Sequence, residues 1–414
     1  MTNTTQQSTK YKRLLCLILA VFFLQATISV QSQSTKKRND QVLKNAMVIG
    51  MTMGIPGMSI AIGYNDQQIW KGADGYSDIL KKTPVNTDDK FGIGSITKTF
   101  VARVILQLAE EGKINLNKTT TDYVNLEIVA QVPNADKASI LQLINHQSGV
   151  PTWEFAPDWI RDGRGDRMRL DHVWGKTETL KYITKNKAKA DFKPGEKYAY
   201  SNTNYTLLGL ITEAVTGNEL MTEIRNRIFE PLHLDHIYLE SFEEIPGGIV
   251  NHYHYATPAF EKVAGVHSQF KEIRPYLVES TLANLSPEWA AGGMVASASN
   301  LVRWIQAIKN GELLGEKMKK EVFTYHPPKK ITNHNREYLQ GISSTLNFYK
   351  GEKAYGHSGG TLGFTAMMFW LEESDISIVL LTNVGRMHSN VNPSPVSYFY
   401  KEVLIPAVLK YIQE

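Results

Sequence analysis

A serine and a lysine stand three residues apart in FGIGSITKTFVARVILQLAEEGKI, which covers residues 91–114. The pattern predicts a helix over 91–112 with Ser95 at its start, where unpaired N–H groups favour developing negative charge. Lys98 then lies on the same helix face as Ser95. The helix is apolar nearly all round, so its first turn should be buried, and a desolvated amine could accept the serine proton. The alternative is an ordinary serine cap with a lysine beside it.

A tyrosine and an asparagine lie two positions apart in PGEKYAYSNTNYTLLGLI. Pro194 and Gly195 predict a turn, and a helix begins shortly afterwards. Tyr200 and Asn202 therefore fall on the short loop between them, where a phenol could relay a proton and an amide could hold a substrate carbonyl or the lysine. The alternative is that Ser201 or Asn202 caps the helix and the tyrosine packs.

A histidine, a serine and two glycines end a predicted strand in YGHSGGTLGF. Gly359 and Gly360 would let a ligand backbone approach the strand closely, as a peptide added to a sheet edge does. His357 could polarise the site, and Ser358 could donate to a substrate carboxylate. The alternative is a glycine-rich turn beside a histidine with satisfied hydrogen bonds.

The elements that must position these residues begin with a helix and a hairpin. DQVLKNAMVIGMTMG has helical spacing and stops at Gly54 and Pro56. GMSIAIGYNDQQIWKGADGYSD predicts two strands joined at Asn65 and Asp66. Early strands are thus available to pair with strands from elsewhere in the chain.

The rest of the chain is a long section of helical patterns followed by strands and a last helix that Pro406 should bend. Early and late strands most simply form one antiparallel sheet, with the middle section beside it. We therefore predict an α+β fold, in which residues 40–115 and 325–414 form a sheet domain and residues 116–324 form an inserted, mainly helical domain.

The N-terminal segment is typical of a secretory signal peptide, predicted to span residues 1–32. A basic start is followed by the apolar run LLCLILAVFFLQA, which is short for a membrane span. The alternative is an uncleaved anchor. Lys10, Lys12 and Arg13 carry three of the four net positive charges, so the remainder carries +1, which argues against a nucleic-acid surface. Cys16 is the only cysteine, so the exported protein should have no disulfide and no thiolate metal site.

The three chemical motifs, in this order, strongly resemble the serine β-lactamase and penicillin-binding superfamily. They most resemble the branch of class C β-lactamases, D-alanyl-D-alanine carboxypeptidases with a His-x-Gly triad, and related esterases. FGIGSITKTF, LINHQSGVPTW, YAYSNTNYTLLGLI, AAGGMVASASNLVRW and GHSGGTLGF carry the resemblance, which covers nearly the whole exported chain. It implies an antiparallel sheet with helices on both faces, an all-helical region, and a site between them without a cofactor.

The resemblance also implies a role for each matching residue. Ser95 would be the acylated nucleophile and Lys98 its activator, while Tyr200 would share proton transfer with the leaving group. The backbone N–H groups of Ser95 and Gly360 would form the oxyanion hole. Asn202 would bind the substrate amide. The histidine of the His-x-Gly triad would replace the lysine found in β-lactamases of this branch.

The sequence therefore predicts an exported serine hydrolase, periplasmic or secreted, acting on a small molecule or a cell-wall peptide. The His-x-Gly triad favours a D-alanyl-D-alanine carboxypeptidase over a β-lactamase or an esterase on the same site. A non-catalytic module that binds wall peptides or penicillin is the further alternative, and the oligomeric state stays open. His252 and His254 in NHYHY have zinc-ligand spacing, but without a third ligand nearby they predict no metal site.

Overall fold

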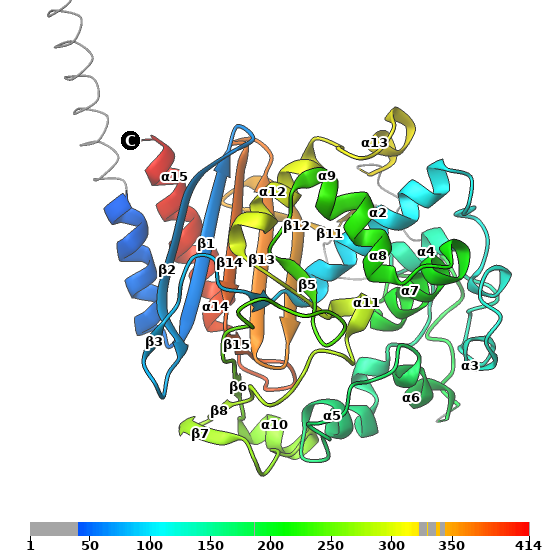
Figure 1. Ribbon diagram of the computed structural model, residues 1–414, viewed down its shortest axis with the longest axis horizontal. Helices are drawn as coiled ribbons and strands as arrows, with labels where there is room; N and C mark the ends of the chain where they lie inside the picture. Colours follow the sequence, from blue (N-terminus) through cyan, green and yellow to red (C-terminus); the bar gives the residue numbers. More distant parts are fainter. Residues whose placement is uncertain (1–39, 186, 323–328, 330–336, 340–343, 414) are drawn as a thin grey trace, which may run out of the picture.

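The computed structural model describes residues 40–185, 187–322, 329, 337–339 and 344–413. An eight-stranded antiparallel sheet stands between two layers of helices (Figure 1). The blue N-terminal helix and the red C-terminal helices cover one face, and a larger helical region lies beyond the other (Figure 1). The predicted α+β fold with an antiparallel sheet flanked by helices is confirmed.

The central sheet joins the two ends of the chain. Its strand order is β10-β11-β12-β13-β14-β1-β2-β3. In the middle of the sheet β1 pairs with β14, so that Met58 lies opposite Thr382 and Ile62 opposite Ile378. The strands of this sheet are β1 (Gly57–Tyr64), β2 (Gln67–Asp78), β3 (Thr83–Pro84), β10 (Glu337–Leu339), β11 (Ser344–Tyr349), β12 (Glu352–Thr361), β13 (Phe364–Leu371) and β14 (Ile376–Thr382).

The first two strands form the predicted hairpin. Asn65 and Asp66 connect them with φ values of 48° and 62°. Both angles lie in the left-handed region, which Asn and Asp tolerate better than most residues and which two-residue hairpin turns require. The helix before the hairpin covers 40–52 and ends before Gly54 and Pro56, as predicted.

The outer helical layer packs on the sheet through apolar side chains, among them Met47 from the helix over 40–52 and Phe399 from the C-terminal end. The C-terminal helical stretch consists of α14 (Pro395–Tyr398), the π-helical η6 (Phe399–Leu404) and α15 (Ile405–Gln413). Pro406 lies in the first turn of α15 and has no N–H to donate to the preceding turn. The wide turn before it is one of the ways a helix absorbs such a loss.

The helical region beyond the other face contains many short helices. They are α2 (Thr97–Glu110), α3 (Glu127–Ala130), α4 (Ile140–Ile144), α5 (Pro157–Arg164), α6 (Lys181–Thr184), α7 (Asn202–Thr216), α8 (Leu220–Ile224), α9 (Glu230–Leu232), α10 (Pro258–Val263), α11 (Trp289–Gly292), α12 (Ala298–Lys309) and α13 (Glu316–Val322). Single 3-10 or π turns are η1 (Gly94–Ile96), η2 (Thr120–Asp122), η3 (Trp153–Phe155), η4 (Glu178–Leu180) and η5 (Arg225–Phe229).

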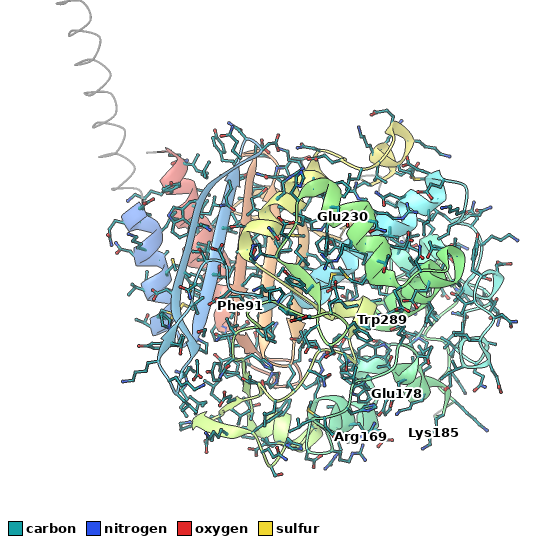
Figure 2. All side chains as sticks on the ribbon, in the orientation of Figure 1. Phe91, Arg169, Glu178, Lys185, Glu230 and Trp289 are labelled. Atoms are coloured by element: carbon teal, nitrogen blue, oxygen red, sulfur yellow. The ribbon has the colours of Figure 1, made fainter. Side chains whose placement is uncertain are left out.

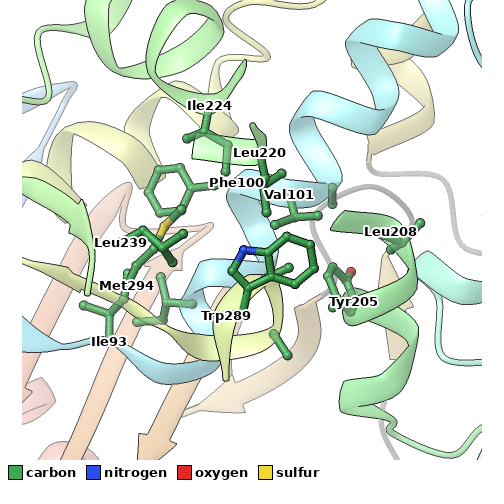
Figure 3. Close-up of a cluster of buried hydrophobic side chains, with 14 of the residues drawn as sticks. Ile93, Phe100, Val101, Tyr205, Leu208, Leu220, Ile224, Leu239, Trp289 and Met294 are labelled. Carbon is green, nitrogen blue, oxygen red and sulfur yellow. The ribbon is translucent and has the colours of Figure 1, made fainter. Parts of the chain in front are cut away.

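Helix α2 runs through the centre of this region. Phe100 on α2 stacks on Trp304 of α12 with ring centroids 4.4 Å apart. Figure 3 shows Phe100 and Val101 of α2 packed with Tyr205 of α7 and Trp289 of α11. Trp289 lies in the interior, whereas Arg169, Glu178 and Lys185 lie near the rim of the helical region (Figure 2). The first turn of α2 is buried, as predicted.

Two small sheets were not predicted. β4 (Phe91–Gly92), β9 (Met294–Ala296) and β5 (Ile237–Leu239) form one, and β15 (Val384–Gly385), β6 (Tyr253–Tyr255), β8 (Leu277–Glu279) and β7 (Lys271–Arg274) form the other. Strands this short carry too little periodicity to be recognised in sequence. The helix predicted over 91–112 is corrected accordingly, because Phe91 pairs with Ala296 in a strand and α2 starts only at Thr97.

The predicted signal peptide, residues 1–32, lies outside the described residues, and the division into sheet and helical domains stays a prediction. Within the described ranges, every helix is too short or too polar to cross a bilayer.

Strand β12 passes very close to the turn that precedes α2. A Cβ built on Gly359 would lie 1.8 Å from the carbonyl oxygen of Ile93 and 3.0 Å from the amide nitrogen of Ser95. Gly94, which has a φ of 51°, lies against the same strand: a Cβ there would be 2.5 Å from the Gly360 nitrogen. Glycine is therefore required where two backbones touch.

We predict that Gly359→Ala destabilises the protein by about 1–3 kcal/mol or more, because the added methyl forces β12 away from the turn. Gly175→Ala is the matched control, since among the described residues nothing lies within 4 Å of an added Cβ. It should change the free energy of unfolding by less than about 0.5 kcal/mol. Urea unfolding measures both free energies. Equal effects would refute the inference that the two backbones touch at Gly359.

Candidate active site

Ser95 and Lys98 are in direct contact. Ser95 lies in η1, one turn before α2, and Lys98 lies in the first turn of α2. The Lys98 Nζ donates a hydrogen bond to Ser95 Oγ across 2.9 Å. In the described part of the chain the Ser95 side chain makes no capping bond to either helix. Ser95 therefore does not act as a helix cap, which was the alternative interpretation of this motif.

Lys98 is completely removed from water, with an exposed fraction of 0%. Its Nζ also donates to the carbonyl oxygen of Ala291 in α11, which fixes the amine from a second side. Burial lowers the pKa of Lys98 to about 7, although the nearby carboxylates of Glu154 and Glu288 act in the opposite direction. In a substantial fraction of the molecules the Lys98 amine is therefore neutral near pH 7, as a proton acceptor for Ser95 must be.

Tyr200 lies beside this pair. The Lys98 Nζ is 4.9 Å from the centre of the Tyr200 ring. Burial raises the pKa of Tyr200 well above its ordinary value, and a contact with the Ser95 hydroxyl partly opposes this. The Tyr200 hydroxyl is buried and has no hydrogen bond of full geometry to any described residue. Tyr200 is thus a neutral phenol, and its O–H can donate a hydrogen bond to another group in the site.

His146, in the LINHQSG segment, packs against the ring of Tyr200. The two rings stack with centroids 4.2 Å apart and an interplanar angle of 27°. Its Nδ1 accepts a hydrogen bond from the Ser201 N–H across 3.1 Å, so Nδ1 carries no proton. Burial, the Lys98 charge and His357 hold the pKa of His146 well below its usual range. Sequence reasoning assigned His146 no role because only the folded chain brings it to Tyr200.

Asn202 is the first residue of α7 and does not cap it. Ser201 is the N-cap residue, and it makes no side-chain cap bond within the described chain. The Asn202 Nδ2 instead donates to Glu154 Oε2 across 2.7 Å. The Asn202 Oδ1 is buried and has no hydrogen-bond partner among the described residues. The motif therefore holds the Asn202 amide against Glu154, a residue that the sequence prediction missed.

Glu154 belongs to a buried ionic cluster behind the site. Arg164 Nη2 contacts Glu154 Oε1 at 3.3 Å and Glu288 Oε1 at 2.8 Å. All three side chains are buried, and burial raises the pKa of Glu288 to about 7 while the Arg164 charge opposes this. The cluster brings together η3, α5 and the segment before α11. No local sequence signal could have revealed it.

The aromatic residues near Glu154 have two different roles. Trp153, Trp159 and Trp174 are buried and pack in the interior. Phe155 is 62% exposed, and its ring meets that of His388 edge-on at 5.9 Å. Phe155 is thus the exposed aromatic side chain of this stretch.

The third motif lies on β12. His357 is buried, and its ring centre is 6.2 Å from that of Tyr200. The His357 Nδ1 donates to the Ser358 carbonyl oxygen at 2.5 Å. Burial and the Lys98 charge lower the pKa of His357 to about 3, so the ring is neutral at physiological pH. Ser358 is exposed on the same strand.

The structure therefore brings the three predicted motifs to one place. Gly359 and Gly360 lie against the turn of Ser95, with Ser95 and Gly360 contributing backbone N–H groups on neighbouring segments. A serine oxygen, a buried amine, a neutral phenol and two backbone amides in such proximity can support acyl transfer.

The two histidines with zinc-ligand spacing are used otherwise. His252 Nδ1 is 2.8 Å from Ser280 Oγ, and His254 Nε2 donates to the Met387 carbonyl at 3.0 Å. The described residues contain no group of three metal-ligating side chains.

Comparison with known proteins adds to this geometry. The profile of the Beta-lactamase family matches residues 40–393. Protein flp of Staphylococcus aureus strain COL is 27% identical over 350 residues, which are 80% of this chain and 60% of that protein. The chain thus spans three fifths of that relative's length. The putative penicillin-binding protein PbpX of Bacillus subtilis strain 168 is 23% identical over 363 residues, covering 86% of this chain and 78% of that protein.

The fold is also found among solved structures. The D-amino acid amidase of Ochrobactrum anthropi SV3, solved in complex with D-phenylalanine, matches with a TM-score of 0.73 and 24% identity. The match covers 91% of this chain and 99% of the amidase. Since the family profile covers most of the sequence, the chain belongs to the Beta-lactamase family of serine hydrolases.

Proposed function

We propose that this protein is an exported hydrolase that cleaves peptides ending in D-Ala-D-Ala through an acyl-enzyme on Ser95. The observation that carries the proposal is the 2.9 Å hydrogen bond between Lys98 Nζ and Ser95 Oγ in a site where the lysine is fully buried. An unpaired surface lysine would be protonated near pH 7, whereas burial lowers the pKa of Lys98 to about 7, which supports its proposed role as the base. Export rests on the predicted signal peptide over residues 1–32.

The proposed reaction has two steps. Ser95 Oγ attacks the carbonyl carbon between the two D-alanines and its proton passes to Lys98. The C–N bond then breaks as the Tyr200 hydroxyl donates a proton to the leaving amine and regains one from protonated Lys98, so that D-alanine leaves and both side chains are neutral again. Water then hydrolyses the ester, which releases the shortened peptide as a carboxylic acid and returns the proton to Ser95 Oγ. The N–H groups of Ser95 and Gly360 would stabilise the oxyanion, and such donors contribute about 3–4 kcal/mol each in studied acyl-transfer enzymes.

Two lines support a D-configured peptide as substrate. The His357-Ser358-Gly359 triad resembles that of the carboxypeptidases, and the structurally similar amidase carries D-phenylalanine. The exposed Ser358 hydroxyl is available to a substrate carboxylate. Because His357 is neutral, it would contribute hydrogen bonding rather than charge.

A β-lactamase and a carboxylesterase would use the same first step. A receptor without turnover would not need a buried amine on its serine, and the Ser95–Lys98 contact therefore disfavours it.

We predict that a fluorophosphonate labels the protein once, on Ser95. Ser95→Ala should abolish the label, and Lys98→Ala should lose it while retaining a folded circular dichroism spectrum, because the serine then lacks its base. Mass spectrometry locates the adduct. Labelling at another residue, or none, would refute the acyl-enzyme.

A D-Ala-D-Ala peptide, a chromogenic cephalosporin and a p-nitrophenyl ester then decide the substrate class, with turnover of the peptide expected.

We predict that kcat/KM rises with pH and levels off above about 7. Lys98 must be neutral to accept a proton, and its folded pKa is about 7, so activity is lost as pH falls through that value. His357, with a pKa of about 3, stays neutral and adds no titration in this range. The matched control is His357→Gln, which should keep the midpoint. A flat profile between about pH 5 and 9 would contradict the assignment.

We predict that Tyr200→Phe acts selectively on poor leaving groups. The ring and its stack on His146 remain, but the proton donor is lost. The kcat for the peptide should fall by about 10²–10⁴-fold. The kcat for a p-nitrophenyl ester should fall far less, because its leaving group needs no proton. Steady-state kinetics with both substrates measures this, and equal losses would count against a proton-donor role.

A further inference from the structure

Three charged side chains, Arg164, Glu154 and Glu288, are buried together beside Asn202. Arg164 is 1% exposed and sits between the carboxylates of Glu154 and Glu288, which are 6% exposed each. Its Nε and Nη1 atoms are buried without a hydrogen-bond partner among the described residues. Burying charge costs several kcal/mol per ion unless geometry and hydrogen bonds compensate. The stabilisation of the fold does not by itself explain this arrangement.

The contact of this cluster with the site is one hydrogen bond. Glu154 uses Oε1 for Arg164 and Oε2 for the Asn202 Nδ2, which lies 2.7 Å away. An ionised carboxylate only accepts hydrogen bonds, so the amide of Asn202 must turn its nitrogen toward Glu154. The Asn202 Oδ1 is consequently turned away from Glu154, and it is buried with no hydrogen-bond partner in the described chain. The cluster thus determines which way this amide faces.

We propose that Glu154 is a positioning residue that fixes the orientation of the Asn202 amide for substrates containing an amide group. Arg164 anchors Glu154, and Glu288 balances the charge of Arg164. The fixed Asn202 offers one oxygen acceptor and its second N–H to the substrate side of the site. This inference rests on the proposed function and adds the group that selects amide-bearing substrates.

Glu154→Gln tests the orientation because the two residues have nearly the same shape. Arg164 only donates hydrogen bonds, so it should draw the oxygen of the new glutamine. The glutamine NH₂ then faces Asn202, which must turn its own oxygen toward position 154. The variant therefore inverts the Asn202 amide instead of merely loosening it.

The experiment measures two rates for each variant: kcat/KM for an N-acetylated D-Ala-D-Ala peptide, and the rate of Ser95 labelling by an alkyl fluorophosphonate, which has no amide. Glu154→Gln should lower the first by about tenfold or more, the cost of leaving a buried polar group without its hydrogen bond. Both rates are measured well above pH 7, where Lys98 is neutral in every variant, and the second should then stay within about twofold. The matched control is Glu288→Gln, which alters the other partner of Arg164 and should leave the ratio of the two rates unchanged.

A double-mutant cycle with Asn202→Ala completes the test, since coupled residues give non-additive effects. In the Asn202→Ala background, Glu154→Gln should have no further effect on the peptide rate. Additive losses, or equal losses in both rates, would overturn the positioning role while leaving the acyl-enzyme intact. A wild-type protein that the fluorophosphonate does not label would instead refute the proposed function and this inference with it. Labelling without peptide turnover would overturn the amide selection alone.

Discussion

The burial of one amine is the constraint on which the rest of the site depends. Lys98 must be desolvated for its pKa to fall to about 7, yet it must keep hydrogen bonds so that its charged form is tolerated. Ser95 and the carbonyl of Ala291 supply those bonds, and the rings of Tyr200 and Tyr205 lie 4.9 and 5.5 Å from the amine. Helices α2, α7 and α11 meet around this point, which explains why α2 is buried along most of its length.

The second requirement is that a sheet strand touches the serine turn. β12 can do so only because it carries glycine where the backbones meet, and because the turn itself contains Gly94 in the left-handed region. The central sheet holds β12 through β13 and β14, and β14 pairs with β1 from the start of the chain. The three-layer fold thus holds strand β12 against the turn that contains Ser95.

Electrostatics divides the titratable groups around the site into two sets. His146 and His357 are neutral because they are buried beside a lysine. Arg164 is balanced by buried carboxylates. Their lowered pKa values make both rings poor acceptors for the serine proton, while the ionic cluster contacts Asn202 through Glu154. The two sets still interact: burial lowers the pKa of Lys98 while the carboxylates of Glu154 and Glu288 oppose this, and Glu288 itself has a pKa of about 7.

The sequence by itself determined the features set by short-range rules. The turn at Asn65 and Asp66, the antiparallel sheet of early and late strands, and the proximity of Ser95 to Lys98 follow from turn chemistry, strand patterning and helical spacing. The order of the three motifs pointed to a family, and the resemblance implied a role for each matching residue. The apolar pattern of α2 also predicted that its first turn is buried. Only the tertiary structure decided that the Ala291 carbonyl, 193 positions away, binds the Lys98 amine and that Glu154 accepts a hydrogen bond from Asn202. These partners come from distant segments, and the degree of desolvation depends on everything packed around a group, so a local window of sequence does not contain them.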